Sequence, residues 1–405
     1  MSNAAQSERL HIAFIGKRNA GKSSLVNKFI GQDLVIVSEI PGTTTDPVKK
    51  SMELLPFGPV VLIDTAGIDD TGELGEKRII KTIKIISEAD FALVVEPREK
   101  LSEQERNLIN NLKELGLPCL VIINKSDLGI NYELIDELNS AGIKFHPVSC
   151  KNDEGIYELK EKVSSLLPSE ENPSLIGDLI KQHDIIVLVV PIDLGAPKGR
   201  LIMPQVQTIR EALDEDAIVV VAKDKELRAV LSKLSQNPKL IVTDSQAIMR
   251  VIADVPDEIQ LTTFSILMAR LKGDLPEYVR GLKRIDELKN GDKVLIAEAC
   301  SHHAQEDDIG KVKIPRWLRL HTKKNLEIDV VNGHDFPENI SEYKLIVHCG
   351  GCMLTRKAMQ VRIKQAKYMN VPIVNYGVAI SYMHGAVPRA LLPFSEAFAA
   401  WKSIN

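Results

Sequence analysis

The feature that most constrains this fold is a glycine-rich stretch, Gly16-Lys-Arg-Asn-Ala-Gly-Lys-Ser23, which matches the phosphate-loop pattern GxxxxGK[ST]. An apolar run, 11–16, leads into it, and an amphipathic stretch, 22–29, follows it. Such a loop cradles phosphates at a strand-to-helix turn, where backbone amides and the start of the helix face the anion. The first part of the chain must therefore place a strand, a tight turn and a helix in that order.

The same turn indicates which residues act on the phosphates. Lys22 is expected to reach the β- and γ-phosphates, and Ser23 to ligate Mg²⁺. A second carboxylate for the metal is available at Asp64 in the motif Asp64-Thr-Ala-Gly67, and the amide of Gly67 can contact the γ-phosphate. Between these motifs lie the candidate switch threonines, Thr43, Thr44 and Thr45. One of them is expected to bind Mg²⁺.

The base is specified by Asn124-Lys-Ser-Asp127, which also ends a strand-like run. The Asp127 carboxylate can accept hydrogen bonds from guanine N1–H and the exocyclic amine. Adenine lacks this pair of donors and would leave the carboxylate unpaired, so the site selects GTP over ATP. Ser149-Cys150-Lys151 is suited to contact the guanine carbonyl through a backbone amide.

The candidate nucleotide site draws on all of these motifs. Its members are Gly16, Asn19, Ala20, Gly21, Lys22, Ser23, Ser24, Thr43, Thr44, Asp64, Gly67, Asn124, Lys125, Asp127, Ser149, Cys150 and Lys151. Lys22, Thr44 and Gly67 are the residues expected to act in hydrolysis.

Composition limits the function classes. Hydrophobic residues make up 44% and charged residues 26% of the 405 residues, the balance of a soluble globular protein. The net charge of −4 provides no global attraction to nucleic acid or to anionic membranes. The longest apolar run, 185–192, is too short to span a bilayer. The cysteine count, 5, is odd, which argues against a disulfide framework and favours a reducing cytoplasm.

Strand-like and helix-like runs alternate along the chain, which predicts an α/β fold with parallel sheets. The polar, proline-bracketed stretch 167–173 is the best domain boundary. It separates a nucleotide-binding domain, 1–168, from a second α/β domain, 173–262, and a third, 263–405. A helix over 261–271 is expected to open the third segment. An exposed apolar face on the second domain would suit oligomerisation.

The third domain carries two sets of soft-metal ligands, Cys300-Ser-His302 and His348-Cys349-Gly-Gly-Cys352. Each set follows a strand-like run, so parallel strands would bring both to one edge of a sheet. The glycines would let the backbone approach a metal closely, and a helix starting after Cys352 would favour thiolates. A closed zinc site and an iron–sulfur cluster with one iron left for a weaker ligand fit these residues about equally well.

Over residues 10–168 the chain resembles the Era/TrmE branch of GTPases, whose switch sequence is close to Pro41-Gly-Thr-Thr-Thr-Asp46. The resemblance implies that Thr44 is the Mg²⁺ ligand and that Asn19 helps to hold K⁺. Thr45 replaces the usual arginine. Ile68 stands where Ras-type enzymes carry a catalytic glutamine, and an aliphatic side chain cannot orient water. We therefore expect slow GTP hydrolysis that K⁺ stimulates.

The whole chain, a phosphate-loop GTPase followed by Cys-x-His and His-Cys-x-x-Cys, resembles the HydF family of [FeFe]-hydrogenase maturation GTPases. This resemblance implies GTPase, dimerisation and cluster-binding domains in a homodimer. It implies a [4Fe–4S] cluster on Cys300, Cys349 and Cys352, with the fourth position open or held by His302, His348 or another group. It also implies a scaffold that receives a diiron precursor built with HydE and HydG and passes it to the [FeFe]-hydrogenase apoprotein.

Two other functions remain open at this point. One is a tRNA-modification or ribosome-assembly GTPase with a structural zinc site. The other is a metal-storage or metal-sensing module whose GTPase domain serves only as a dimerisation switch. Metal analysis separates the zinc alternative from the iron–sulfur one, and a variant unable to bind GTP separates the sensing module from the GTPase.

Overall fold

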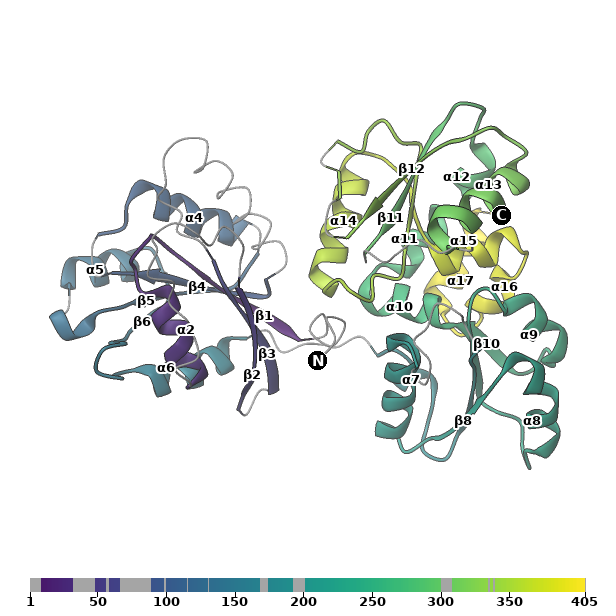
Figure 1. The fold of residues 1–405 in the computed structure, drawn as a ribbon, viewed down its shortest axis with the longest axis horizontal. Coiled ribbons are helices and arrows are strands. Elements are labelled where there is room, and N and C mark those ends of the chain that lie inside the picture. Colours follow the sequence, from purple (N-terminus) through teal and green to yellow (C-terminus); the bar gives the residue numbers. More distant parts are fainter. Residues whose placement is uncertain are drawn as a thin grey trace. The chain divides into compact units, whose positions relative to one another are not determined.

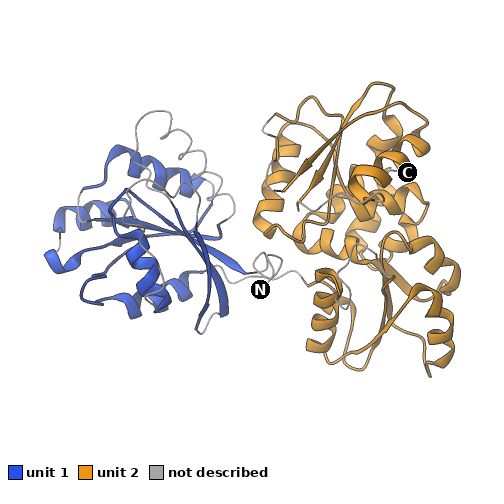
Figure 2. Ribbon diagram, viewed as in Figure 1, with its two compact units in different colours: residues 1–170 blue, residues 171–405 orange. Residues whose placement is uncertain are grey.

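The computed structural model describes residues 9–31, 48–55, 58–65, 89–97, 100–114, 116–129, 131–167, 174–191, 201–299, 308–333, 336–337 and 339–404. The chain forms two compact units, unit 1 (residues 1–170) and unit 2 (residues 171–405) (Figure 2). Five expected site residues lie outside the described residues, namely Thr43, Thr44, Gly67, Cys300 and His302.

Unit 1 is built on one sheet with the strand order β2-β3-β1-β4-β5-β6. Its strands are β1 (Leu10–Ile15), β2 (Val48–Leu54), β3 (Gly58–Asp64), β4 (Phe91–Glu96), β5 (Cys119–Ile123) and β6 (Phe145–Pro147). The strands run parallel, as expected, except for the edge strand β2, which pairs antiparallel with β3. Alternation in the sequence did not reveal this strand because its residues are mostly polar and exposed.

Helices cover both faces of this sheet (Figure 1). They are α2 (Lys22–Ile30), α4 (Glu103–Glu114), α5 (Tyr132–Ser140) and α6 (Ile156–Leu166), with a short 3₁₀ turn, η1 (Ser126–Leu128). In β1, Ile12 and Phe14 belong to the core formed with α2 and α6, whereas Ala13 and Ile15 belong to the core formed with α4 and α5. The continuous apolar run of β1 follows from this burial on both faces.

Unit 2 contains two wholly parallel sheets, which confirms the expected fold class. The first has the order β10-β9-β7-β8, with β7 (Ile185–Val189), β8 (Ile218–Ala222), β9 (Leu240–Thr243) and β10 (Gln260–Thr263). Its helical segments are η2 (Gly177–Leu179), α7 (Met203–Asp214), η3 (Asp224–Glu226), α8 (Leu227–Lys233) and α9 (Ile248–Asp254).

The second sheet has the order β12-β11-β13-β14, with β11 (Lys293–Glu298), β12 (Glu327–Asn332), β13 (Leu345–His348) and β14 (Ile373–Asn375). Its helical segments are α10 (Phe264–Lys272), α11 (Leu275–Arg280), α12 (Lys283–Glu287), the π-helical η4 (Ile309–Lys313), α13 (Ile314–Thr322), α14 (Arg356–Tyr368), α15 (Tyr376–Met383), α16 (Val387–Leu391) and α17 (Ser395–Ile404).

The helix expected over 261–271 was partly wrong, because its first residues form β10. Thr262 and Thr263 are β-branched and fully buried, which suits a strand. Thr263 then caps α10, since its hydroxyl oxygen accepts a hydrogen bond from the amide of Ile266 at 3.2 Å.

The two sheets of unit 2 share one hydrophobic core, in which Leu188 of β7, Leu267 of α10 and Ile296 of β11 belong to the same cluster. Figure 1 shows α10 between the two sheets. None of the helices in the described ranges combines the length and apolar character that crossing a bilayer requires.

Candidate functional site

The phosphate loop follows β1 and ends at α2. Glycine is required at both of its motif positions: a Cβ on Gly16 would lie 2.3 Å from the carbonyl oxygen of Val95, and a Cβ on Gly21 would lie 2.2 Å from Nδ2 of Asn124. Gly21 also has a φ of 93°, which favours glycine. The turn is therefore packed tightly against the ends of β4 and β5.

Lys22 is buried, and its ammonium lies inside the curve of the loop. It donates hydrogen bonds to the carbonyl oxygens of Gly16 at 2.9 Å and Lys17 at 2.6 Å. These carbonyls hold the ammonium at the place where the β- and γ-phosphates of a nucleotide bind in such loops. The side chain is thus positioned to exchange carbonyl for phosphate oxygens.

A candidate cation site lies where Ser23, at the start of α2, meets Asp64, at the end of β3. The Ser23 hydroxyl donates to Oδ2 of Asp64 at 2.7 Å. Oδ1 of Asp64 is buried and has no hydrogen-bond partner among the described residues. Burial raises the pKa of this carboxyl above its ordinary value. A buried carboxylate oxygen beside a hydroxyl is the ligand type that Mg²⁺ takes, so these residues fit that ion.

The base-side motif is held by a short chain of hydrogen bonds. Nδ2 of Asn124 donates to the carbonyl oxygen of Ala20 at 2.9 Å, and Oδ1 accepts from the Lys125 amide at 2.8 Å. Asn124 therefore fixes the phosphate loop against the loop that carries Asp127. The Ser149 hydroxyl donates to Oδ1 of Asp127 at 2.8 Å, which orients the carboxylate expected to face guanine.

The remaining expected residues lie on the same loops or at the start of α2. Asn19 has a φ of 61° within the phosphate loop, and Ser24 is exposed on α2. Cys150 is half-buried, and burial raises the pKa of its thiol to about 11. Its side chain is therefore protonated at neutral pH. Lys151 is exposed beside it.

Sequence reasoning missed a pair of buried carboxyl groups beside the phosphate loop. Glu96 ends β4 and Glu105 lies in the first turn of α4, and both are fully buried. Oε2 of Glu105 accepts from the Ser102 amide at 2.7 Å and lies 2.9 Å from Nζ of Lys17. Burial, followed by the neighbouring Glu105, raises the pKa of Glu96 to about 9. The sequence held one signal that could have revealed the pair: Glu96 is the only polar residue of the strand β4, and it is the last one.

The pKa of Glu105 moves in the opposite direction. Burial raises it, but hydrogen bonds from Glu96, Lys17 and Ser102 outweigh burial and hold it below its ordinary value. One carboxyl of the pair is thus protonated and the other ionised at neutral pH, and Lys17 of the phosphate loop pairs with the ionised one. The carboxyl pair thus places one negative charge beside the phosphate loop, and Lys17 carries the positive charge that pairs with it.

The cysteine turn of unit 2, residues 349–354, follows β13. This strand lies beside β11 and parallel to it, with Ala297 opposite His348, which confirms the expectation that the two strands end at the same edge. Sγ of Cys349 accepts from the amide of Ala299 at 3.0 Å and from the amide of Gly351 at 3.4 Å. Cys300 directly follows Ala299 in the chain.

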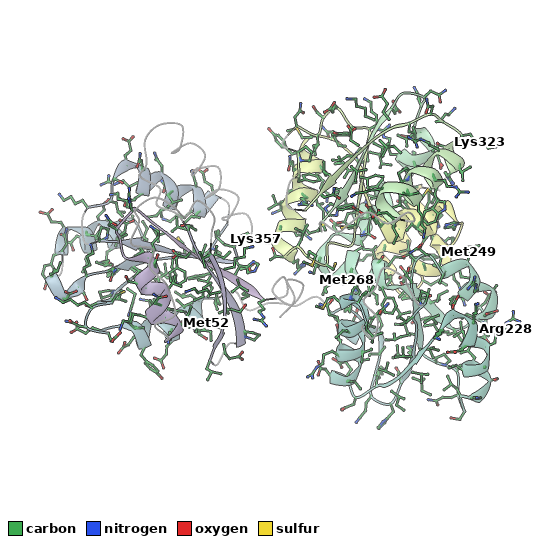
Figure 3. The ribbon with its side chains drawn as sticks, viewed as in Figure 1. Met52, Arg228, Met249, Met268, Lys323 and Lys357 are labelled. Atoms are coloured by element: carbon green, nitrogen blue, oxygen red, sulfur yellow. The ribbon has the colours of Figure 1, made fainter. Side chains whose placement is uncertain are left out.

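The glycines of this turn lie close to two methionines. A Cβ on Gly350 would be 3.6 Å from Cβ of Met268, labelled on α10 in Figure 3. Gly351 has a φ of 65°, and a Cβ there would meet Cε of Met359 at 2.3 Å. Among the described residues, no three His, Cys, Asp or Glu side chains form a metal-holding group. Neither Cys349 nor Cys352 is in a disulfide.

His348, one of the candidate metal ligands, has a protein partner on each ring nitrogen. Its side chain is fully buried, with Nε2 2.8 Å from Nη1 of Arg362 and Nδ1 2.8 Å from the carbonyl oxygen of Cys349. Burial, and then the Arg362 charge, lower the pKa of His348 to about 3. The ring is therefore neutral, accepting at Nε2 and donating at Nδ1. Both nitrogens are engaged, so His348 would have to break one of these bonds to bind a metal.

Family models match three segments of the chain. Residues 11–125 match the model described as "50S ribosome-binding GTPase". Residues 175–273 match "Hydrogen maturase F dimerization domain". Residues 276–393 match "Hydrogen maturase F tetramerization domain". The last two segments together contain both sheets of unit 2.

Relatives of known function share a shorter region. GTPase Der of Clostridium botulinum strain Langeland is 41% identical over 132 residues, which cover 31% of this chain and 30% of the relative. The tRNA modification GTPase MnmE of Nitrosomonas europaea is 37% identical over 155 residues, 38% of this chain and 34% of the relative. The chain thus spans about a third of the length of these relatives.

Solved structures are more distant. Aquifex aeolicus Era bound to GDP and AlF4⁻ has 20% sequence identity and a TM-score of 0.37, covering 53% of this chain and 93% of that chain. The G domain of the T. maritima FeoB iron transporter has 22% identity and a TM-score of 0.31, covering 39% and 99%.

Proposed function

This chain belongs to the hydrogen maturase F family, and on that premise we propose that it is a GTP-binding and GTP-hydrolysing scaffold that carries a [4Fe–4S] cluster and delivers a diiron precursor to [FeFe]-hydrogenase. The observation that carries the metal part is the bond from the Ala299 amide to Sγ of Cys349, at 3.0 Å. It joins the strand that leads to Cys300 with the strand that leads to Cys349 and Cys352.

The GTPase part rests on unit 1. Lys22 is poised for the phosphates, and the free lone pairs of Asp64 beside Ser23 suit Mg²⁺. Asp127, oriented by Ser149, would select guanine. We propose that Thr44 completes the Mg²⁺ site, that Gly67 contacts the γ-phosphate, and that hydrolysis is slow and stimulated by K⁺ held at Asn19. Ordering of the switch segments by GTP would change the affinity for partners.

The metal part rests on three thiols, Cys300, Cys349 and Cys352. Amide hydrogen bonds to Sγ of Cys349 favour a thiolate there, because they place the positive ends of backbone dipoles at the sulfur. A cluster held by three cysteines supplies, when bound, one iron that is open to a further ligand. We propose His302 or a group from outside the chain for that position, since His348 is engaged on both nitrogens.

The partners follow from the family. We propose that the radical maturases HydE and HydG supply the diiron precursor, and that the hydrogenase apoprotein receives it. The matched segments are described as dimerization and tetramerization domains, and this chain accordingly forms oligomers. We propose a homodimer formed through β8, an edge strand with Ile218 and Val221 about half exposed. A cytoplasmic location suits cysteines kept reduced for metal binding.

The deciding experiment is anaerobic reconstitution with iron and sulfide, followed by iron, sulfide and zinc analysis and electron paramagnetic resonance. Wild-type protein should bind about four irons and four sulfides per chain and give a reduced-cluster signal. Cys300→Ser should alter or lose that signal, whereas Cys119→Ser, in unit 1, should keep it. One tightly bound zinc with no chromophore would instead support the RNA-directed GTPase with a structural zinc site.

GTP turnover is measured on the same preparation in KCl and in NaCl. Faster turnover in KCl is expected, and loss of that difference in Asn19→Ala would identify the residue that holds the ion. Equal rates in both salts would contradict the potassium part alone and leave the cluster proposal unaffected.

A further inference from the structure

A buried lysine forms hydrogen bonds with the cysteine turn. Lys272, the last residue of α10, is only 4% exposed. Its ammonium donates to the carbonyl oxygens of Gly351 at 3.4 Å, Cys352 at 3.3 Å and Leu354 at 2.8 Å. These three bonds tie the cysteine turn to the end of α10 and keep a positive charge beside it.

The end of α10 is itself fixed in place. Nε2 of Gln360, on α14, donates to the carbonyl oxygens of Lys272 at 3.4 Å and Gly273 at 2.8 Å. The backbone that carries the ammonium is thereby tied to the helix that follows the cysteine turn. The position of the Lys272 ammonium is thus set by α10, which carries it, and by α14, which holds the end of α10.

The carbonyl of Cys349 is bonded to His348, and a second buried cation, Arg362, bonds to the other side of that ring. His348 donates from Nδ1 to this oxygen, and Arg362, 5% exposed, donates to the same ring at Nε2. The carbonyls of the turn are thus bonded to groups from α10 and β13. The amides of Ala299 and Gly351 are bonded to Sγ of Cys349 instead. The carbonyl oxygens named above are therefore bonded to other groups, whereas two amide N–H groups point at Sγ of Cys349 and place positive dipole ends there.

We propose that Lys272 is a positioning residue for an anionic metal–thiolate centre at the cysteine turn. Its ammonium fixes the turn before metal arrives, and its charge favours the negative charge that thiolates and a reduced cluster bring. The inference rests on the proposed function in that Cys349 and Cys352 hold the metal. It adds that α10, within the segment matched as a dimerization domain, supplies part of the metal site's support.

The first test uses the full chain without metal. Hydrogen exchange of the amides of residues 350–354 is compared in wild type, Lys272→Met, Lys272→Gln and Lys272→Arg. Loss of the three carbonyl bonds should speed exchange by about tenfold in the Met and Gln variants, and Arg should restore most of the protection. The matched control is Lys367→Met, because Lys367 is a surface lysine of α14 paired with Asp274 and Glu277.

The second test uses anaerobically reconstituted protein. The Gln variant, which keeps a donor but no charge, should reduce its cluster at a lower potential than wild type and retain less iron per chain. The Arg variant should rescue both properties, and Lys367→Met should match wild type. A purely structural role would not predict rescue of the potential by another cation.

The outcomes are separable. Wild-type exchange and wild-type potential in the Gln variant overturn the inference. If Lys272→Met unfolds, as judged by tryptophan fluorescence, the Gln and Arg variants decide. If wild-type protein binds no iron, the proposed function fails. The positioning role of Lys272 is tested separately, because unchanged hydrogen exchange at residues 350–354 in the metal-free variants would overturn it.

Discussion

Arg362 donates from Nη1 to Nε2 of the fully buried His348 across 2.8 Å. This bond fixes the tautomer of the imidazole, because a ring that accepts at Nε2 must carry its proton at Nδ1. That proton then reaches the carbonyl oxygen of Cys349 at 2.8 Å. A guanidinium on α14 therefore sets the backbone of a candidate metal ligand through a histidine.

Removing this guanidinium should destabilise unit 2. In Arg362→Met, the buried His348 loses a hydrogen-bond donor, and Phe336 loses the guanidinium that lies 5.0 Å from its ring centroid. We expect a loss of about 1–3 kcal/mol in the free energy of unfolding. Both tryptophans, Trp317 and Trp401, lie in unit 2, so urea unfolding followed by their fluorescence measures this directly.

The control for this variant is Arg280→Met, an arginine on α11 whose side chain is 56% exposed. Exposed ion pairs contribute little, so its unfolding curve should overlay that of wild type. Equal stability of the Arg362 variant and this control would show that the buried bond is dispensable.

Stability of unit 2 should fall in mild acid because of His348. Its pKa is about 3 in the folded protein and 6.5 ordinarily, so the unfolded chain binds a proton more readily. The stabilisation is complete above pH 6.5 and is lost as pH falls toward 3. Unfolding measured from pH 7 to pH 4 should show a smaller decline in His348→Gln. Parallel curves for the two proteins would argue against a neutral histidine.

Glu96 predicts the opposite pH dependence in unit 1. Its pKa rises from 4.5 to about 9 on folding, so the folded state binds the proton more tightly. This contribution is fully present below pH 4.5 and is lost as pH rises toward 9. Glu96→Gln mimics the protonated carboxyl and should resist alkaline unfolding better than wild type. Circular dichroism melts between pH 6 and pH 9 test this, with the exposed Glu114→Gln as control.

The two ends of α2 provide a matched pair of glycines. Gly21→Ala should lower GTP affinity at least about tenfold, because its Cβ would lie 2.2 Å from Nδ2 of Asn124 and strain the loop. Gly31 also has a positive φ, 79°, but a Cβ there meets nothing within 4 Å. Fluorescent-nucleotide titration should therefore show near wild-type affinity for Gly31→Ala. Equal losses in both variants would point to backbone strain alone.

The edge strand β8 should mediate self-association. Ile218 is 49% and Val221 48% exposed, and a lysine at either position would charge the open edge. We expect Ile218→Lys and Val221→Lys to shift the protein toward monomer in sedimentation velocity. Met249→Lys, on α9 with 48% exposure, should leave the distribution unchanged. A dimer that survives both edge variants would place the contact elsewhere.

Local sequence patterns predicted that several candidate nucleotide-site residues follow strands at fixed offsets, and the structure describes part of that set. Ser23 and Asp64 meet at 2.7 Å although 41 positions separate them, as parallel strands ending at one edge require. The strand β2 was missed because an exposed edge strand lacks apolar alternation. The burial of Glu96 and Lys272 could not be predicted for another reason: a charged residue in the sequence gives no sign that elements distant along the chain will cover it.

The candidate metal site shows the same limit. Apolar runs predicted the strands that precede Cys300 and Cys349, but that β11 pairs with β13 in parallel was only a condition of the prediction, and the structure supplied it. The sequence could not distinguish His348 as a ligand from His348 as a support, because that depends on Arg362 arriving from α14. The expected contacts of Thr44, Gly67, Cys300 and His302 fall outside the described residues and remain predictions.

The continuous core of unit 2 limits how this molecule can be divided. Side chains of both parallel sheets pack around α10 in one core. Cleaving the chain after residue 273, between the two matched segments, would therefore expose apolar surface on each fragment. Recombination that replaced only one segment would have to repack the other. Natural variation in the two is therefore expected to be correlated, and chimaeras that join segments from different relatives should aggregate unless the residues facing α10 are exchanged with them.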